Sequence, residues 1–167
     1  MPIVLSRYES PLGPLVLASE GDALLALEFP ERSREIRPRL EQAHPGAEVK
    51  EGAPPRPIAS ALAAYFGGDT RALDRVQVRT EGTPFQREVW AALRRIPAGQ
   101  TWSYQELARA VGRPRASRAV GAANGANPVA LVVPCHRVIA TGGKLGGYGG
   151  GLHRKEWLLK HERALIA

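Results

Sequence analysis

Four side chains suited to nucleophilic chemistry lie close together in the second half of the chain: Asn127, Cys135, His136 and Glu156. Cys135 is the only cysteine. A thiol with a pKa of about 8.5 is barely ionised at neutral pH, so a nucleophilic cysteine needs a base, and the base needs an orienting acceptor. His136 and Glu156 can fill these two roles. The alternative is an inert, buried cysteine, since most lone cysteines only pack in a core.

The segment around the cysteine predicts that the thiol is presented where regular structure breaks. Residues 129–133 are an apolar run that predicts a short buried strand, and Pro134 cannot continue a sheet ladder. Neighbouring residues of a strand point to opposite faces, so contact between Cys135 and His136 needs a bend or a bridging water. Seven of the ten residues 142–151 are glycine, without the Gly-Lys-Ser/Thr ending of a phosphate-binding loop, which argues against nucleotide hydrolysis.

Three helices are expected before this segment. Thr83 and Pro84 predict the start of the first, and the capping box at 103–106 predicts the start of the second, which Gly112 can end. After a basic turn at 113–115, Ser117 can cap a third helix that runs to about Gly125. Two short helices joined by a tight turn are the helix-turn-helix pattern.

The third helix has one long side chain, Arg118, among small residues, so its backbone can come close to a partner. Tight packing against other parts of the protein explains the small residues equally well. Charge favours nucleic acid as the partner class: residues 1–80 hold 10 Lys and Arg against 11 Asp and Glu, whereas residues 81–167 hold 13 against 5. The alternative is a basic face that serves only solubility.

Composition sets the class of protein. An apolar content of 44% is enough for a hydrophobic core and excludes disorder as the main interpretation. No apolar stretch reaches the roughly 18–20 residues of a membrane span, and no leader is apparent at the start, so we expect a soluble, unprocessed protein. A single cysteine forms no internal disulfide and no cysteine-rich zinc cluster, which indicates a reducing, cytoplasmic compartment.

The first half predicts a small supporting domain. Apolar runs at 3–5, 15–17 and 23–29, separated by turn residues, predict a β-meander. The charged stretch 31–43 predicts a short or kinked helix because Pro38 interrupts it, residues 58–66 predict a helix, and 76–78 predict an edge strand. The expected fold is therefore α/β of the α+β kind, with domains at 1–80 and 81–167 and a winged helix-turn-helix-like motif in the second, mostly helical domain.

These residues resemble the methylated-DNA-protein-cysteine methyltransferases, also called O6-alkylguanine-DNA alkyltransferases. The resemblance covers about residues 83–163 and is weak before them, at Ser10-Pro11-Leu12-Gly13-Pro14. It is carried by Ser103-Tyr104, Arg118-Ala119-Val120-Gly121, Asn127-Pro128, Val133-Pro134-Cys135-His136-Arg137-Val138-Ile139, the glycine loop with Tyr148, and Lys155-Glu156-Trp157-Leu158-Leu159.

The resemblance implies a protein that flips an alkylated base out of double-stranded DNA and takes the alkyl group onto Cys135 once and irreversibly. The lesion would be O6-alkylguanine, with O4-alkylthymine as a second substrate. A water would link Cys135 to His136, Glu156 would complete the relay, Tyr104 would serve the leaving guanine and Asn127 would brace the nucleophile segment. The base would be held by Val138, Tyr148, Gly149 and Trp157.

The resemblance also implies that the third helix enters the minor groove, with Arg118 filling the gap left by the flipped base. The DNA-binding set is Arg118, Ala119, Gly121, Ala122, Gln105, Arg113 and Thr141. The expected protein is a monomer with no cofactor and no membrane partner. Some relatives hold zinc in the first domain, but residues 1–80 contain no cysteine and only His44, so no metal site is expected. Gly149 and Ala130 stand where some relatives have a hydroxyl residue and a proline, so the resemblance does not imply a size for the alkyl pocket.

Three other functions compete with this interpretation. A non-catalytic relative could bind alkylated DNA and flag it for other repair systems, although such proteins replace the nucleophile that Cys135 provides here. A Cys-His hydrolase would turn over and would need an oxyanion site. A helix-turn-helix transcription factor would bind undamaged DNA by sequence.

Overall fold

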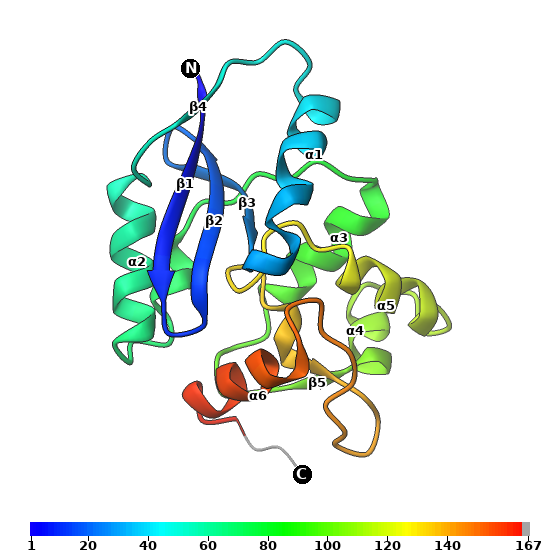
Figure 1. Cartoon of the computed structure of the whole chain (residues 1–167). Coiled ribbons are helices and arrows are strands. Elements are labelled where there is room, and N and C mark those ends of the chain that lie inside the picture. Colours follow the sequence, from blue (N-terminus) through cyan, green and yellow to red (C-terminus); the bar gives the residue numbers. More distant parts are fainter. Residues whose placement is uncertain (165–167) are drawn as a thin grey trace. The chain divides into compact units, whose positions relative to one another are not determined.

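The computed structural model describes residues 1–164, which form two compact units (Figure 1). The first unit holds residues 1–81 and 128–132, and the second holds residues 82–127 and 133–164. The sequence analysis placed segment 128–132 in the second domain. In the structure the Leu27 amide donates to the Pro128 carbonyl and the Ala130 amide donates to the Leu27 carbonyl, both at 3.0 Å, which ties the segment to the first unit.

The first unit is built on a four-stranded sheet in the order β3-β2-β1-β4. Strands β1 (Ile3–Ser10), β2 (Gly13–Glu20) and β3 (Ala23–Glu28) form the predicted antiparallel meander. Gly13 and Gly21 adopt left-handed φ angles of 100° and 59° at the two turns, which suits residues without a Cβ. Strand β4 (Val49–Glu51) adds in parallel beside β1 and was not predicted, because three residues without apolar alternation carry no strand signal.

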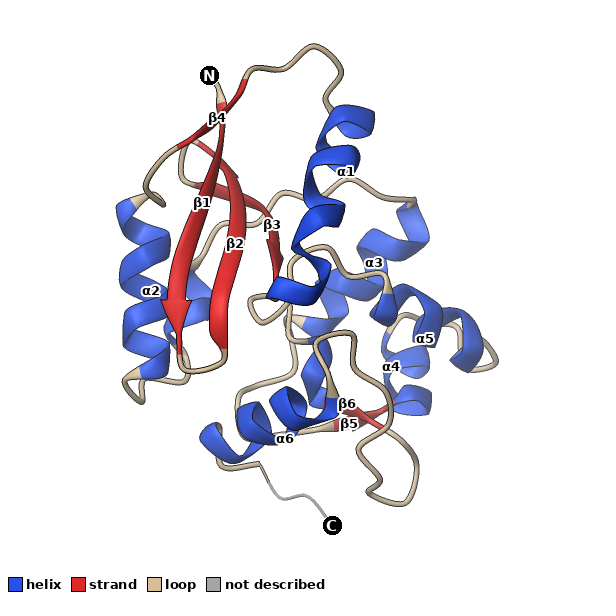
Figure 2. Cartoon of the chain, viewed as in Figure 1, coloured by secondary structure: helices blue, strands red, loops and turns tan. Residues whose placement is uncertain are grey.

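Helices cover both faces of this sheet (Figure 2). Helix α1 (Ile36–Ala43) follows a 3-10 segment at Pro30–Glu35 and packs Ile36 and Leu40 into a core with Ile3 of β1. Helix α2 (Arg56–Phe66) lies on the other face, where Phe66 stacks on Tyr8 at 6.4 Å between ring centroids. Pro38 does not kink α1, because it lies in the first turn, where no hydrogen bond from its nitrogen is needed.

Two predicted strands are reduced to single bridges in the structure. Val78 bridges to Leu24 and Val129 bridges to Leu27, without a continuing ladder at either place. Residues Ala72–Arg75, just before the first bridge in the sequence, form a 3-10 helix. Beyond the second bridge, Leu131 has a positive φ of 72°, which turns the chain out of an extended conformation.

The second unit is mostly helical, which confirms the predicted mixed fold. Its helices are α3 (Pro84–Leu93), α4 (Tyr104–Ala110), α5 (Ser117–Gly125) and α6 (Leu152–His161), and short parallel strands β5 (Trp102–Ser103) and β6 (Val138–Ile139) join them. No helix among residues 1–164 is long and apolar enough to cross a bilayer.

Local sequence determines where the helix-turn-helix pair begins and ends. A capping box forms at Ser103, whose hydroxyl accepts from the Glu106 amide at 3.0 Å while the Glu106 carboxylate accepts from the Ser103 amide at 3.1 Å. Gly112 ends α4 with a left-handed φ of 73°, and the Arg113 amide reaches back to the Ala108 carbonyl at 2.9 Å. Helix α5 starts at Ser117, the residue predicted to cap it, and the N-cap position is one residue earlier, at Ala116.

Candidate functional site

The only thiol lies at a sharp bend in the second unit. Cys135 begins a one-turn 3-10 helix, Cys135–Arg137, and is buried. Its amide donates to the Val133 carbonyl at 2.8 Å, and Pro134 between them has φ −82° and ψ 65°, which is an inverse γ-turn. The bend takes Cys135 and His136 out of strand geometry, so their side chains no longer alternate as they would in a ladder.

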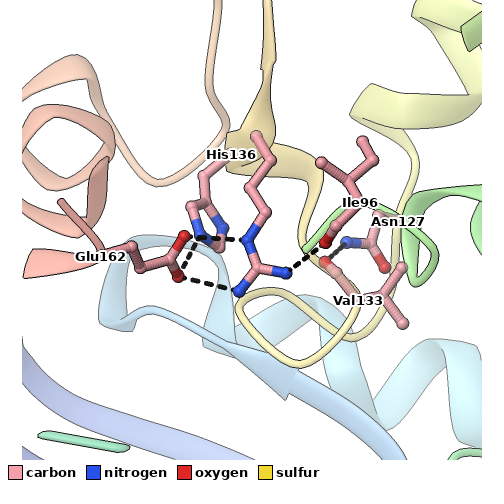
Figure 3. A network of polar contacts seen from close by, with 6 residues as sticks. Ile96, Asn127, Val133, His136 and Glu162 are labelled. Carbon is pink, nitrogen blue, oxygen red and sulfur yellow. Dashed lines mark hydrogen bonds and ion pairs between the residues drawn. The ribbon is translucent and has the colours of Figure 1, made fainter. Parts of the chain in front are cut away.

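The side chain of Asn127 fixes this bend by a hydrogen bond. Its side-chain Nδ2 donates to the Val133 carbonyl at 2.8 Å, two residues before the thiol (Figure 3). The same carbonyl also accepts from the Cys135 amide. One oxygen therefore ties the end of α5 to the segment that carries the sulfur.

His136 is fully buried and binds a carboxylate other than the predicted one. Its Nε2 lies 2.8 Å from Oε2 of Glu162, whose side chain is also fully buried (Figure 3). An ionised carboxylate can only accept, so Nε2 carries the hydrogen. His136 Nδ1 makes no hydrogen bond with any residue of the described chain, 1–164, and keeps its lone pair. This tautomer has its basic nitrogen on the side away from Glu162.

Arg137 completes a buried ionic network. Its Nε and Nη2 donate to the two Glu162 oxygens at 2.8 and 3.0 Å, and its Nη1 donates to the Ile96 carbonyl at 2.7 Å. A guanidinium matches a carboxylate in this two-point geometry. Glu162 is thus fixed by two cationic or polar partners at once.

The electrostatics of the network keep Glu162 ionised and His136 neutral. Burial by itself would raise the pKa of Glu162, but the attraction and hydrogen bonds of His136 and Arg137 outweigh it and hold that pKa well below its usual range. Burial lowers the pKa of His136, and the charges of Arg137 and Lys155 lower it further, so that it falls below its usual value although Glu162 raises it. A neutral imidazole next to a fixed carboxylate is prepared to accept a proton and to be stabilised once it is charged.

The sequence-based assignment of Glu156 as the partner of His136 is wrong. Glu156 lies on the solvent side of α6, where its side chain is 47% exposed and its carboxylate pairs with Lys160 at 2.8 Å. The hydrogen bond and charge of Lys160 lower its pKa. Glu162 follows six residues later and faces inward.

Helical spacing could have identified the correct carboxylate. Lys155, Leu158, Leu159 and Glu162 recur at spacings of three and four residues, and all four are buried. A charged residue on the same helix face as two buried leucines is expected to be buried as well, and a buried charge is expected to be paired. Arg137 and Lys155 were also missed as members of the site, because their role depends on contacts with distant carbonyls.

Three further groups surround the thiol. Burial raises the pKa of Tyr104, and the negative charge of Cys135 raises it further, so the phenol stays protonated near the sulfur. Lys155 donates from Nζ to the Val138 carbonyl at 2.6 Å and to the Gly147 carbonyl at 3.1 Å, and burial lowers its pKa to about 8 against the opposing effect of Cys135. The Tyr148 ring lies edge-on to His136, with 6.4 Å between centroids.

The remaining predicted residues lie at several places in the second unit. Trp157 stacks on His161 at 4.8 Å, and Gly149 is in the exposed part of the glycine loop. Arg118, Ala119 and Ala122 form the exposed face of α5, whereas Gly121 faces the Tyr104 ring. Exposed positions are also found for Gln105, Arg113 and Thr141. No group of three or more potential metal ligands occurs within residues 1–164.

Comparisons with known proteins identify one family over both halves of the chain. Residues 84–164 match the family "6-O-methylguanine DNA methyltransferase, DNA binding domain", and residues 3–80 match "6-O-methylguanine DNA methyltransferase, ribonuclease-like domain". A methylated-DNA–protein-cysteine methyltransferase of Salmonella typhimurium is 50% identical, covering 96% of this chain and 95% of the relative. One from Methanosarcina acetivorans is 44% identical, covering 93% and 95%.

A solved structure shows the same architecture. The crystal structure of Mycobacterium tuberculosis OGT in complex with DNA superposes with a TM-score of 0.81 at 42% identity, covering 96% of this chain and 92% of that chain.

The buried network predicts an acid-sensitive fold. Because the pKa of Glu162 is depressed in the folded state, its contribution to stability is present above the unfolded value of about 4.3 and is lost as pH falls below it. Glu162→Gln should cost about 3–5 kcal/mol at neutral pH, since Arg137 would be left buried without a counter-ion. The dependence of Tm on pH between about 3 and 5 should also be flatter in Glu162→Gln than in the parent protein.

The matched control is Glu156→Gln on the same helix. Thermal unfolding followed by circular dichroism should show a nearly unchanged Tm for this exposed change. Equal losses for the two variants would mean that Glu162 does not carry the buried charge.

Proposed function

The chain belongs to the methylated-DNA–protein-cysteine methyltransferase family, and from this membership we propose that it repairs DNA by moving the alkyl group of O6-alkylguanine onto the sulfur of Cys135. Direct alkyl-transfer repair is the activity of the family, and a DNA-binding domain is present. The observation that supports Cys135 as the acceptor is the buried pair beside it, a neutral His136 oriented by an ionised Glu162.

The reaction needs a thiolate, and the network provides a route for the proton. We infer that a water carries the thiol proton of Cys135 to Nδ1 of His136, while Nε2–H remains bonded to Glu162. The sulfur then attacks the alkyl carbon, the S–C bond forms and the C–O6 bond breaks. Tyr104, still protonated, donates to the departing guanine, which leaves as the repaired base.

The chemistry accounts for a single event per molecule. The product is a thioether, which has no good leaving group, and the scheme contains no reductant to restore the thiol. The reaction requires no cofactor, since the alkyl group moves as an electrophile from oxygen to sulfur.

Access to the reacting carbon requires the base to leave the stack. We propose that α5 enters the minor groove with its exposed small residues, Ala119 and Ala122, while Arg118 fills the vacated space. The flipped base would lie against the Val138 carbonyl, Tyr148 and Gly149, with Trp157 behind them. Val138 already accepts from Lys155, but a carbonyl has a second lone pair for a base. O4-alkylthymine would be a second substrate and the working unit a monomer.

The first prediction concerns the acceptor. Incubation with duplex DNA carrying radiolabelled O6-methylguanine should move the label to the protein, at no more than one methyl group per molecule, and peptide mapping should place it on Cys135. Cys135→Ser should leave the label on the DNA. Repeated turnover would identify a hydrolase, and binding without transfer by the parent protein would identify a protein that only flags damage.

The second prediction concerns the relay. His136→Ala and Glu162→Gln should each slow methyl transfer at neutral pH, and the double variant should be little slower than the slower single one, because the two residues act as one base. The deficits should shrink as pH rises above about 8.5, where solvent ionises the thiol unaided.

Rates are measured in single-turnover quench experiments on variants whose circular dichroism spectra match the parent. Glu156→Gln is the control, since the exposed carboxylate lies outside the network. Multiplicative effects of the two changes, or deficits that persist at high pH, would exclude a shared relay.

The third prediction concerns Arg118. If it occupies the space of the flipped base, Arg118→Ala should slow repair of duplex DNA about 10- to 100-fold, since filling and stacking in such positions contribute about 1–3 kcal/mol. Reaction with O6-methylguanine as the free base should hardly change. Arg115→Ala, which removes an exposed charge from the neighbouring turn, controls for the loss of one phosphate contact. Similar slowing of both substrates would place Arg118 in the chemistry or the fold.

A further inference from the structure

Trp90, on α3, makes a buried hydrogen bond that the proposed reaction does not use. Its indole Nε1 donates to the Ala123 carbonyl at 2.8 Å, and only 5% of the residue is exposed. Ala123 lies in the last turn of α5, where the carbonyls of a helix run out of amide partners within the regular pattern. A side chain from another helix therefore supplies a donor at the end of α5.

The backbone hydrogen bonds of this last turn depart from α-helical geometry. The regular pattern would pair the Asn127 amide with the Ala123 carbonyl, but that amide donates to the Asn124 carbonyl at 3.4 Å. The Ala123 carbonyl accepts from the Ala126 amide instead, at 3.2 Å, which is the long limit of an ordinary N–H···O bond. The bond from Trp90 is 0.4 Å shorter, so the indole is the better placed of these two donors.

The end of α5 leads directly to the segment that carries the thiol. Asn127 follows Gly125, the last residue of the helix, by two positions, and its Nδ2 donates to the Val133 carbonyl at 2.8 Å. The Cys135 amide donates to the same carbonyl, also at 2.8 Å. A displaced last turn of α5 would therefore move Asn127, and with it the bend before Cys135.

The start of α3 fixes the orientation of the Trp90 ring. A Cβ added at Gly82 would lie 2.7 Å from Cζ3 and 2.8 Å from Cη2 of the indole, so the ring packs directly against the Gly82 backbone. The adjoining capping box, in which Thr83 and Gln86 exchange hydrogen bonds, holds this part of the chain in place. The indole therefore connects the start of α3 to the end of α5.

We propose that Trp90 is a positioning residue for the nucleophile: its hydrogen bond to Ala123 fixes the last turn of α5 and, through Asn127, the place of Cys135. The inference rests on the proposed function and adds to it a residue that acts through others. The bond from Trp90 is separate from the network of His136 and Glu162. Loss of this bond should therefore misplace the sulfur without changing how the thiol is ionised.

The test removes the indole N–H and keeps the ring. Trp90→benzothienylalanine, introduced by codon suppression, preserves the bicyclic shape with sulfur in place of the N–H group. Trp90→Phe is the second variant, and Gly82→Ala keeps the N–H but displaces the ring. Trp102→benzothienylalanine, at a half-buried position on β5, is the matched control for the unnatural residue.

Single-turnover methyl transfer is measured with O6-methylguanine in duplex DNA, at saturating protein, and with O6-methylguanine as the free base. Each rate is measured from about pH 7 to about pH 9.5, across the range in which a free thiol ionises. The same replacement at Trp90 is also made in an Asn127→Ala background. Circular dichroism and thermal unfolding establish that each variant is folded at the temperature of the assay.

The expected result is a loss of rate that does not depend on pH. Trp90→benzothienylalanine should slow transfer about 3- to 10-fold, which corresponds to the loss of one hydrogen bond, and by the same factor on both substrates. The factor should persist at high pH, because a misplaced thiolate reacts slowly even when it is fully formed. Gly82→Ala should slow both reactions, and the control at Trp102 should match the parent.

The Asn127→Ala background tests the route of the effect. Replacement of Trp90 should cost little more in this background, because the two residues act in series on the same segment. The pH comparison uses the single variants alone, so it remains decisive if Asn127→Ala does not fold.

Four results would overturn the proposal. A lower Tm with unchanged rates would show that Trp90 only stabilises the fold, and a deficit confined to duplex DNA would show that it serves only DNA binding by α5. A deficit that disappears at high pH would place Trp90 in thiol ionisation, and multiplicative effects with Asn127→Ala would exclude the shared route. If the parent protein transfers no methyl group from either substrate, the proposed function itself fails, which is a separate outcome.

Discussion

The site depends on one buried charge, the carboxylate of Glu162. A carboxylate removed from water is destabilising unless it is paired and hydrogen-bonded, and here Arg137 and His136 occupy both of its oxygens. Arg137 neutralises the charge of Glu162 and also donates to the Ile96 carbonyl, beyond the end of α3, so the same side chain joins two parts of the second unit. Satisfying this charge draws the end of α6 and the segment after Pro134 into one arrangement.

The arrangement determines which ring nitrogen of His136 carries the lone pair that the proposed relay would use. Because Glu162 takes the Nε2 hydrogen of His136, the lone pair is at Nδ1. Burial keeps the imidazole neutral, so its proton-accepting form is the resting form. The inward face of α6 contributes a second charge, Lys155, whose bonds to the Val138 and Gly147 carbonyls hold the start of β6 and the glycine loop. The inward face of α6 thus supports both His136 and the glycine loop.

The two sides of the nine-residue helix α5 have different roles in the structure. Its outer face has only small side chains apart from Arg118, which allows close approach to DNA, and its inner face meets Tyr104 at Gly121. Asn127, just past its end, holds the bend before Cys135 through the Val133 carbonyl. If α5 contacts DNA as proposed, movement of this helix would affect that contact and the position of the sulfur together.

Local sequence alone determined the elements that depend on local rules. The capping box at Ser103, the left-handed Gly112 and the turns of the meander were predictable because their hydrogen bonds join residues two to five apart. Residue type and family resemblance were enough to predict Cys135 as the nucleophile and His136 as its base, the roles that the proposed function gives them. Helical spacing could have placed Glu162, and not Glu156, on the inward face of α6. Only the tertiary structure decided that His136 and Arg137 are the partners of Glu162, because these contacts join residues far apart in the sequence. Tertiary structure also decided that residues 49–51 form strand β4, because they pair with β1. It decided that residues 129–133 do not form a strand, because only Val129 finds a pairing partner. In both places, pairing with distant residues overrides local strand propensity.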